Sequence, residues 1–266
     1  MAGGDLDGYV VVVTGGSSGL GRAIAEDCAS RGAAAVVINY AHNQADAEEA
    51  ARRVEAKGAK AVVVQGDVAD DSDCRKIAAA AEPFGRIDAL FNNAGQTTFA
   101  NHADMDAVSA ENFQRIYAVN VVGAFQMIRA CRSLLESAPR PGAVVNTSSI
   151  AGVTGIGSSV PYAASKGALV TMTLSLARAL APKIRVNAIC PGYIDTPWFG
   201  RGNPPEVVDR IRQGAAAGSP LQVASTPEDL AGAAVFLASP AARHVTGETL
   251  LADAGSHLGR ASLAMR

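Results

Sequence analysis

Three side chains in the second half of the chain have the types and spacing of a proton-transfer site. Tyr162 and Lys166 are four residues apart in a stretch that is predicted to be helical, so they lie on one face. A neighbouring ammonium group favours the phenolate of a tyrosine and lowers its pKa from about 10. Ser149 follows an apolar run and can donate a hydrogen bond to a carbonyl oxygen that gains charge as hydride arrives. This set predicts acid/base chemistry at a carbonyl or an alcohol.

Asn120 is a polar residue inside an otherwise apolar helical stretch, Y-A-V-N-V-V-G. Its apolar neighbours predict that the amide is buried, where it needs hydrogen-bond partners. Together with the other three residues, we expect Asn120 to order a water molecule at the same site.

The stretch Val13–Gly21, V-T-G-G-S-S-G-L-G, fits two different chemistries. Residues 15–19 match G-x-S-x-G, the turn that presents the nucleophilic serine of a hydrolase, which would make Ser17 the nucleophile. The same glycines also allow a turn whose N–H groups and following helix face a phosphate, with Ser17 and Ser18 as hydroxyl donors. The position after the first strand favours the phosphate-binding alternative.

Small and polar residues follow several further apolar runs. Asp67, in Q-G-D-V, offers a carboxylate to the exocyclic amine of an adenine. Asn92–Gly95 has small residues that let a cofactor approach the backbone, and an asparagine there can connect neighbouring strands. Pro191 and Gly192 occupy the equivalent place in C-P-G-Y-I-D-T-P. Each is compatible with ordinary turn chemistry, but together they favour a dinucleotide site.

The elements that must position these residues alternate between short apolar runs and longer helical stretches. The runs lack in/out alternation, which is typical of parallel strands covered on both faces, so we expect a single α/β domain over residues 1–266 with a doubly wound sheet of about seven strands. The predicted strands are Tyr9–Thr14, Ala34–Tyr40, Lys60–Gln65, Ile87–Phe91, Ala143–Thr147, Ile184–Cys190 and Thr249–Ala252. The predicted helices are Leu20–Ser30, Gln44–Lys57, Ser72–Glu82, Glu111–Ser137, Tyr162–Ala181 and Pro227–Leu237. Such a sheet binds ligands at the carboxyl ends of its strands.

Composition makes several other classes of partner improbable. The net charge of -2 and the absence of a Lys/Arg cluster argue against nucleic acid and membrane surfaces. The four cysteines are far apart and form no C-x-x-C motif, so we expect no metal site and a reducing compartment. The N-terminal residues do not resemble a signal peptide, and we expect a cytoplasmic protein.

The motifs taken together resemble those of the short-chain dehydrogenase/reductase family over essentially the whole chain. They are T-G-G-S-S-G-L-G (Thr14–Gly21), N-N-A-G (Asn92–Gly95), Asn120, Ser149, Y-A-A-S-K (Tyr162–Lys166) and P-G-Y-I-D-T (Pro191–Thr196). The resemblance implies a Rossmann-type fold and a nicotinamide cofactor. It also implies a role for each of four residues. Tyr162 would be the acid/base, and Lys166 would bind the nicotinamide ribose and lower the tyrosine pKa. Ser149 would hold the substrate oxygen, and Asn120 would position a proton-relay water.

The predicted cofactor site collects residues from the ends of the strands. NADP(H) is favoured over NAD(H), because I-N-Y-A-H-N after the second strand has no carboxylate to repel a 2′-phosphate, and only His42 and Arg22 offer positive charge nearby. The predicted cofactor-binding residues are Gly15, Ser17, Ser18, Gly19, Leu20, Gly21, Asn39, Tyr40, Ala41, His42, Asp67, Val68, Asn93, Ala94, Gly95, Tyr162, Lys166, Pro191, Gly192, Ile194 and Thr196.

The substrate is less constrained than the cofactor. The I-N-Y-A-x-N segment is similar to that of 3-oxoacyl-carrier-protein reductases, whereas sugar, polyol and steroid dehydrogenases of the family share the same four catalytic residues. We expect a mobile substrate loop with a short helix at about Thr196–Ser219. The predicted substrate-site residues are Gln96, Ser149, Thr154, Tyr162, Tyr193, Trp198 and Phe199.

We also expect an oligomer, and two other classes of function remain open. The resemblance implies a homotetramer built partly on the stretches Glu111–Ser137 and Tyr162–Ala181, with a second interface near Asp253–Gly255. A serine hydrolase that uses Ser17 would tolerate Tyr162→Phe. A non-catalytic nucleotide-binding regulator would share the glycine loop, but it would not need Asn120, Ser149, Tyr162 and Lys166.

Overall fold

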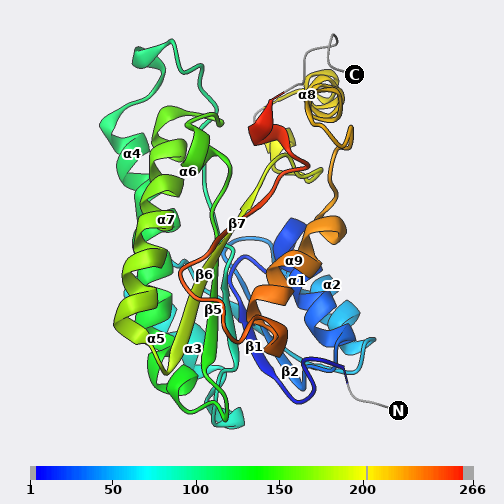
Figure 1. Ribbon diagram of the computed structural model, residues 1–266, viewed down its shortest axis with the longest axis vertical. Helices are drawn as coiled ribbons and strands as arrows, with labels where there is room; N and C mark the ends of the chain where they lie inside the picture. Colours follow the sequence, from blue (N-terminus) through cyan, green and yellow to red (C-terminus); the bar gives the residue numbers. More distant parts are fainter. Residues whose placement is uncertain (1–3, 202, 260–266) are drawn as a thin grey trace.

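The computed structural model describes residues 4–201 and 203–259. Within these residues, seven strands form one parallel sheet in the order β3-β2-β1-β4-β5-β6-β7 (Figure 1). The strands are β1 Val10–Val13, β2 Ala35–Tyr40, β3 Lys60–Gln65, β4 Ala89–Asn92, β5 Gly142–Thr147, β6 Ile184–Pro191 and β7 Thr249–Ala252. The predicted doubly wound α/β fold is therefore confirmed.

Both faces of the sheet are covered by helices, which explains why the strand sequences are apolar at every position. In β1, Val11 and Val13 pack against α1 and α9, whereas Val10 and Val12 pack toward α3 and α5 on the other face. Figure 1 shows this division, with α1, α2 and α9 on one side of the sheet and α3, α5 and α7 on the other. The long helices are α1 Gly19–Ser30, α2 Gln44–Glu55, α3 Asp71–Ala79, α4 Ala110–Tyr117, α5 Ala124–Glu136, α7 Val160–Leu180, α8 Pro205–Gly218 and α9 Pro227–Ala238.

Shorter helical segments lie mainly between these elements. The segment η3 (Ala118–Gly123) is a π-helix that joins α4 to α5, so the single helix predicted over Glu111–Ser137 is widened in its middle. The other short segments are η1 Glu82–Phe84, η2 Met105–Ala107, α6 Ala151–Thr154, η4 Phe199–Arg201, η5 Pro240–Ala242 and η6 Ser256–Leu258.

The segment Thr196–Ser219 differs from its prediction. Most of it is helical, because α8 alone covers fourteen of its residues, so the predicted short helix is too short. The glycines and alanines of this segment suggested a loop, but alanine is a strong helix former and Pro205 is well suited to the first turn. Helix α8 lies beyond the carboxyl ends of the strands (Figure 1).

Candidate active site

The reversal of strand order between β1 and β4 sets the position of the site. Strands β2 and β3 lie on one side of β1, and β4 to β7 lie on the other. The loops that leave β1 and β4 therefore diverge and open a crevice at the carboxyl edge. The glycine-rich segment follows β1, and the N-N-A-G segment includes the end of β4.

The glycine loop requires glycine at defined places. Gly15 has a φ of +59°, and a side chain there would meet the Cα atom of Ala94 at 3.0 Å. At Gly21, a Cβ atom would be 2.3 Å from the Gly15 carbonyl oxygen and 2.4 Å from Nδ2 of Asn93. The glycines therefore let the first turn of α1 lie directly against the ends of β1 and β4.

This geometry leaves hydrogen-bond donors at the start of α1. The Arg22 N–H donates to the Ser18 carbonyl, so the preceding N–H groups at the start of the helix have no intrahelical acceptor. The Ser18 hydroxyl does not cap the helix. This is the arrangement that a phosphate group needs, with donors and the positive end of the helix dipole together.

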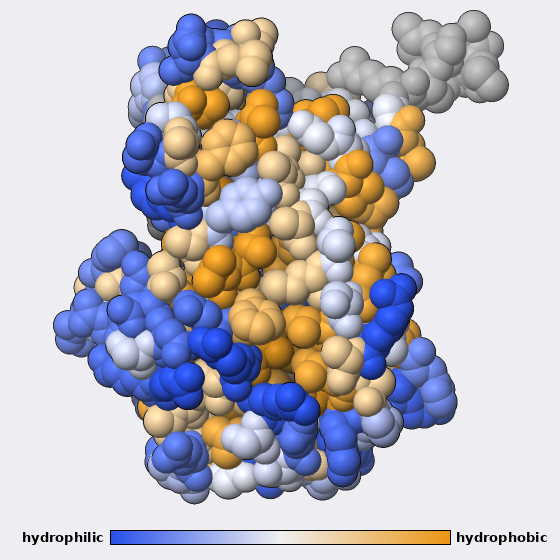
Figure 2. All heavy atoms as spheres, turned by 90° about the vertical axis from the view of Figure 1, so that its left-hand side faces the viewer, coloured by the Kyte–Doolittle hydropathy of each residue, from blue (hydrophilic) through white to orange (hydrophobic). Residues whose placement is uncertain are grey.

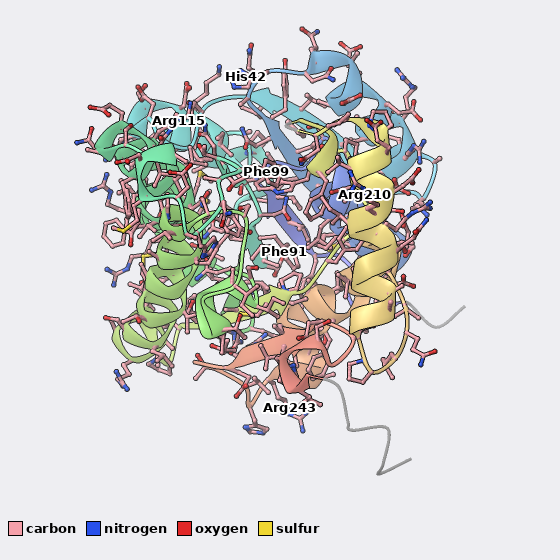
Figure 3. The ribbon with its side chains drawn as sticks, turned by 90° about the horizontal axis from the view of Figure 1, so that it is seen from above. His42, Phe91, Phe99, Arg115, Arg210 and Arg243 are labelled. Carbon is pink, nitrogen blue, oxygen red and sulfur yellow. The ribbon has the colours of Figure 1, made fainter. Side chains whose placement is uncertain are left out.

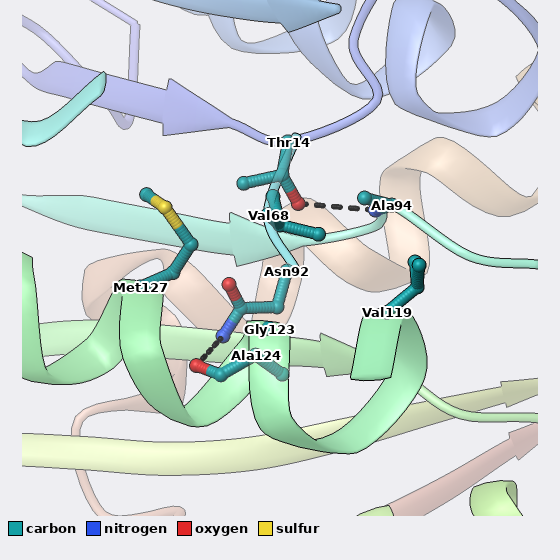
Figure 4. Close-up of a pocket in the computed structure, with 8 residues that line it drawn as sticks. All are labelled: Thr14, Val68, Asn92, Ala94, Val119, Gly123, Ala124 and Met127. Atoms are coloured by element: carbon teal, nitrogen blue, oxygen red, sulfur yellow. Dashed lines mark hydrogen bonds between the residues drawn. The ribbon is translucent and has the colours of Figure 1, made fainter. Parts of the chain in front are cut away.

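Asn93 and Thr14 connect β4 to β1. The Thr14 hydroxyl oxygen accepts hydrogen bonds from the N–H groups of Asn93 and Ala94, both at 3.0 Å (Figure 4). The Asn93 side chain donates to the carbonyl oxygens of Thr14 and Gly15. The predicted asparagine connection between strands is confirmed. The Asn93 amide is thus bonded to protein, and Ala94 and Gly95 are the residues whose backbone borders the crevice.

Asn92 makes a second connection, between β4 and β5. Its Nδ2 donates to Oδ1 of Asn146 and to the Ala124 carbonyl, while its buried Oδ1 atom has no hydrogen-bond partner among the described residues. Figure 4 shows Asn92 in a small pocket beside Thr14, Val68 and Met127. The Val68 side chain is buried in that packing, so only its backbone is available to a cofactor.

The end of β2 differs from its predicted arrangement. Asn39 is only 2% exposed, and its Oδ1 accepts a hydrogen bond from the Gly15 N–H at 3.2 Å. Its Nδ2 donates to the Gly66 carbonyl at 2.9 Å. The Asn39 side chain is thus occupied by the fold, so only its backbone remains for the predicted cofactor contact. The buried position within the sheet is the physical reason.

The other residues that were predicted to bind the adenosine part of the cofactor differ in exposure. Tyr40 is buried, Ala41 is half-buried and His42 is exposed. Arg22 lies 3.8 Å from the Glu26 carboxylate and lines a groove with Thr196 and Thr226. Asp67 is exposed after β3, and its carboxylate accepts a hydrogen bond from the Ala69 N–H.

The predicted acid/base group lies where β5 ends and α7 begins, and it consists of Ser149, Tyr162 and Lys166. The Lys166 Nζ atom is 5.7 Å from the centre of the Tyr162 ring and donates to the Thr147 carbonyl at 2.7 Å. The Ser149 hydroxyl oxygen accepts a hydrogen bond from the Ala151 N–H at 3.1 Å, which leaves its own proton to donate. The pair at i and i+4 on α7 thus faces one site, as predicted.

The pKa values of the pair follow mainly from desolvation. Burial raises the pKa of Tyr162 to about 12, with hydrogen bonding from Ser149 opposing the rise, and it lowers the pKa of Lys166 to about 8. We predicted that Lys166 would lower the tyrosine pKa, and this structure contradicts that prediction. The loss of solvation is the largest cause of the rise, and the ammonium group of Lys166 donates to the Thr147 carbonyl.

Asn120 is buried in the π-helical segment, as its apolar neighbours predicted. Its Oδ1 accepts a hydrogen bond from the Gln96 N–H at 2.8 Å, and its Nδ2 donates to the Gln96 carbonyl at 3.0 Å and to the Ser165 hydroxyl at 2.9 Å. Ser165 in turn donates to the Tyr162 carbonyl at 2.7 Å. Ser165 was missed from sequence, although it lies within the Y-A-A-S-K motif. A π-helical turn often marks a functional site.

The segment after β6 forms the remaining side of the site. Gly192 packs so closely that a Cβ atom there would be 2.8 Å from the Cβ of Asp253, and Thr196 lies against Gly19 of α1. Trp198 contacts Tyr162 with 6.2 Å between ring centres. The Thr154 side chain is exposed on α6, and its hydroxyl donates to the Ile150 carbonyl.

The residues present fit a dinucleotide cofactor. The helix-start amides suit its pyrophosphate, and a Cβ atom at Gly95 would be 3.6 Å from Oδ1 of Asn120 and 3.7 Å from Nζ of Lys166. Glycine therefore keeps open the space in front of these two groups. The Ser17 hydroxyl, by contrast, makes no hydrogen bond to a histidine within residues 4–201 and 203–259, so a serine-hydrolase arrangement is not formed.

The described part of the chain lacks two other kinds of feature. It contains no cluster of three or more His, Cys, Asp or Glu side chains that is arranged to hold a metal ion. None of its helices is both long and apolar enough to cross a membrane.

Comparisons with known proteins agree with this geometry. The family model described as enoyl-(acyl carrier protein) reductase matches residues 15–257. A Streptomyces violaceoruber protein that carries the provisional name granaticin polyketide synthase ketoacyl reductase 2 is 39% identical over 251 residues, covering 94% of this chain and 96% of its own. The L-rhamnose 1-dehydrogenase (NAD(P)(+)) of a Sphingomonas species is 38% identical over 256 residues, covering 95% of this chain and 98% of its own.

The fold is also similar to that of a solved structure. The crystal structure of a Burkholderia xenovorans protein, assigned as a short-chain dehydrogenase/reductase, matches with a TM-score of 0.83 and 40% sequence identity. The match covers 94% of this chain and 98% of the other.

Proposed function

The chain belongs to the short-chain dehydrogenase/reductase family of NAD(P)-dependent oxidoreductases, and from that premise we propose that it reduces a ketone or a 3-oxoacyl thioester with NADPH. The observation that carries the proposal is the grouping of Ser149, Tyr162 and Lys166 at the end of β5.

Each residue has a defined part in the proposed reaction. When bound, the nicotinamide ring supplies a hydride to the carbonyl carbon. Ser149 donates a hydrogen bond to the substrate oxygen, whose negative charge grows during the transfer. Tyr162 gives its hydroxyl proton to that oxygen, so the product is a secondary alcohol.

The proton on Tyr162 must then be replaced. The Lys166 ammonium would stabilise the phenolate that is left and would bind the ribose hydroxyls of the cofactor. Asn120 borders the same space, where a water held beside it would pass a proton inward from solvent. The bonds from Asn120 to Gln96 and Ser165 keep the amide in one orientation.

The preference for NADPH rests on the end of β2. Residues 39–42 carry no carboxylate, and the exposed His42 offers a cationic or hydrogen-bonding partner to a 2′-phosphate. The adenine ring would lie beside Asp67 and Val68, and the pyrophosphate would lie against residues 17–21.

The main alternative is a sugar, polyol or steroid dehydrogenase of the same family. The similarity to an L-rhamnose 1-dehydrogenase supports this alternative, whereas the similarity to a polyketide ketoacyl reductase supports our proposal. The proposed substrate segment consists of residues 196–219 and the turn before them. Its aromatic side chains favour an apolar substrate, and they are Tyr193, Trp198 and Phe199.

A homotetramer is part of the proposal. Large apolar side chains are exposed on α4, η3, α5 and α7, namely Phe113, Val122, Phe125 and Leu174, at 38–47% of their surface. Figure 2 shows apolar residues gathered in the middle of this face, with polar residues around them. Such a patch suits a subunit interface. The four free, buried cysteines support a cytoplasmic location.

The proposal is tested by following NADPH absorbance with a panel of ketones, 3-oxoacyl thioesters, sugars and steroids. We expect turnover of the first two classes and a preference for NADPH over NADH. Tyr162→Phe should lower kcat by about 100-fold or more, because it removes the general acid, while Ser17→Ala should keep most of the activity. Near-normal turnover by Tyr162→Phe would contradict the mechanism.

A further inference from the structure

Three aromatic side chains form a continuous contact across the carboxyl edge of the sheet. Phe199 stacks on Tyr193 with 4.9 Å between ring centres and an interplanar angle of 25°. On its other side, Phe199 contacts Phe99 at 6.1 Å and 46°. We refer to Phe99, Phe199 and Tyr193 as the aromatic bridge. Phe99 was not among the residues predicted from sequence.

The bridge connects segments that follow two different strands. Phe99 comes after β4, whereas Tyr193 and Phe199 come after β6. Because β4 and β6 are the two neighbours of β5 in the sheet, the bridge crosses the end of β5, where Ser149 lies. Seen from above, Phe99 lies between Arg115 of α4 and Arg210 of α8 (Figure 3).

The same segment also reaches the acid/base residue. Trp198, next to Phe199 in the chain, contacts the Tyr162 ring at 6.2 Å and 55°. A substrate whose carbonyl oxygen lies between Ser149 and Tyr162 would therefore have aromatic surface against the groups on either side of its carbonyl carbon. Aromatic surface of this size contributes free energy through burial of apolar substrate groups.

Several hydroxyl groups around the bridge are already paired within the protein. The hydroxyls of Thr97 and Ser158 are bonded to each other, and the Tyr193 hydroxyl donates to the Asp195 carboxylate at 3.2 Å. The Thr98 hydroxyl oxygen accepts a hydrogen bond from Arg115 at 3.0 Å. A polyhydroxylated substrate would lose hydrogen bonds to water without gaining these partners, which costs free energy.

We propose that the aromatic bridge selects substrates with an alkyl or aryl group beside the carbonyl and discriminates against polyhydroxylated ones. Phe99 is the specificity-determining residue of the bridge, because it is the bridge residue that the segment after β4 supplies. This proposal rests on the reductase function above and names the chemical class of its substrate.

The first experiment compares kcat/KM for ethyl 3-oxohexanoate and dihydroxyacetone with NADPH. The wild type should prefer the ester, and Phe99→Ala should reduce that preference about tenfold, as expected for removal of one large apolar contact. Phe99→Leu, which keeps apolar bulk, should retain most of the preference. Phe236→Ala, on α9, is the matched control and should leave it unchanged. An unchanged preference in Phe99→Ala, or a wild type that prefers dihydroxyacetone, would overturn the proposal.

The second experiment does not depend on turnover. Trp198 is the only tryptophan, so its fluorescence reports on this segment. Titration with ethyl 3-hydroxyhexanoate should change the emission, glycerol should not, and Phe99→Ala and Phe199→Ala should each weaken ester binding about tenfold. If no carbonyl is reduced but this titration behaves as stated, the reductase function fails and the bridge stands. If reduction occurs but both variants bind the ester as the wild type does, the bridge fails alone.

Discussion

The side-chain oxygen of Asn39 accepts a hydrogen bond from the Gly15 N–H at 3.2 Å, although Asn39 lies in β2 and Gly15 follows β1. The Asn39 carbonyl accepts a second bond from the Gly16 N–H, and its Nδ2 holds the Gly66 carbonyl. One buried amide thus joins the glycine loop after β1 to the turn after β3. The same side chain therefore positions both of these segments of the predicted cofactor site.

Replacement of Asn39 by leucine should weaken NADPH and NADH binding equally, by about tenfold. The change leaves the Gly15 N–H and the Gly66 carbonyl without buried partners, at a cost of about 1–3 kcal/mol each, and it loosens the loop. Calorimetric titration with both cofactors and thermal unfolding would measure the two effects. His42→Ala is the matched comparison, because it should weaken the binding of NADPH but not of NADH, and it should leave Tm unchanged. If Asn39→Leu instead weakened the binding of NADPH only, Asn39 would contact the 2′-phosphate.

The sequence predicted the elements and the shared helix face of Tyr162 and Lys166 well, because both depend on spacing. Tyr162 and Lys166 share a face of a helix at any i and i+4 positions, and the apolar runs of a parallel sheet are distinctive. The role of Asn39 could not be predicted, because the end of a buried strand and a cofactor contact have the same sequence pattern. Phe99 was missed for a related reason, since its partner Phe199 is 100 positions away and only the fold brings them together.

Ser165→Ala should lower kcat about tenfold with little change in KM. The Ser165 hydroxyl links Nδ2 of Asn120 to the Tyr162 carbonyl, so its loss frees the amide and the first turns of α7 near the acid/base residue. Steady-state kinetics over a range of pH would detect a changed proton-transfer step, which a change of stability alone would not produce. Ser175→Ala, exposed on the same helix, is the control. Unchanged kcat and pH profile would show that the bonds to Gln96 hold Asn120 without help.

Arg185→Met should destabilise the fold by about 3 kcal/mol without changing kcat of the folded enzyme. This residue is 9% exposed, and its guanidinium group donates to the carbonyls of Leu237, Ala238 and Ser239 at the end of α9 and to Val245. Methionine fills similar space but leaves these carbonyls unpaired and removes a positive charge from the helix C-terminus. Urea unfolding would measure the loss. Arg178→Met, on the exposed side of α7, should change stability little, and equal effects of the two variants would refute the assignment.

The buried ammonium of Lys166 should make the stability of the wild type rise with pH relative to Lys166→Met. The pKa of Lys166 is lowered by burial to about 8, against an ordinary value of 10.5. Between these two pH values the unfolded chain binds more protons than the folded chain, so unfolding becomes less favourable as pH rises.

The expected slope of the difference between the two stability curves is about 1.4 kcal/mol per pH unit from pH 8 to 10.5, with no difference in slope below pH 8. Cys28, Cys74 and Cys131, whose pKa values are raised by burial, titrate in both proteins and largely cancel. Urea unfolding at a series of pH values would measure both curves. Parallel curves across this window would mean that Lys166 keeps an ordinary pKa in the folded protein, through water reaching the ammonium beside Thr147. The phenolate of Tyr162 would then form at a lower pH than burial alone allows.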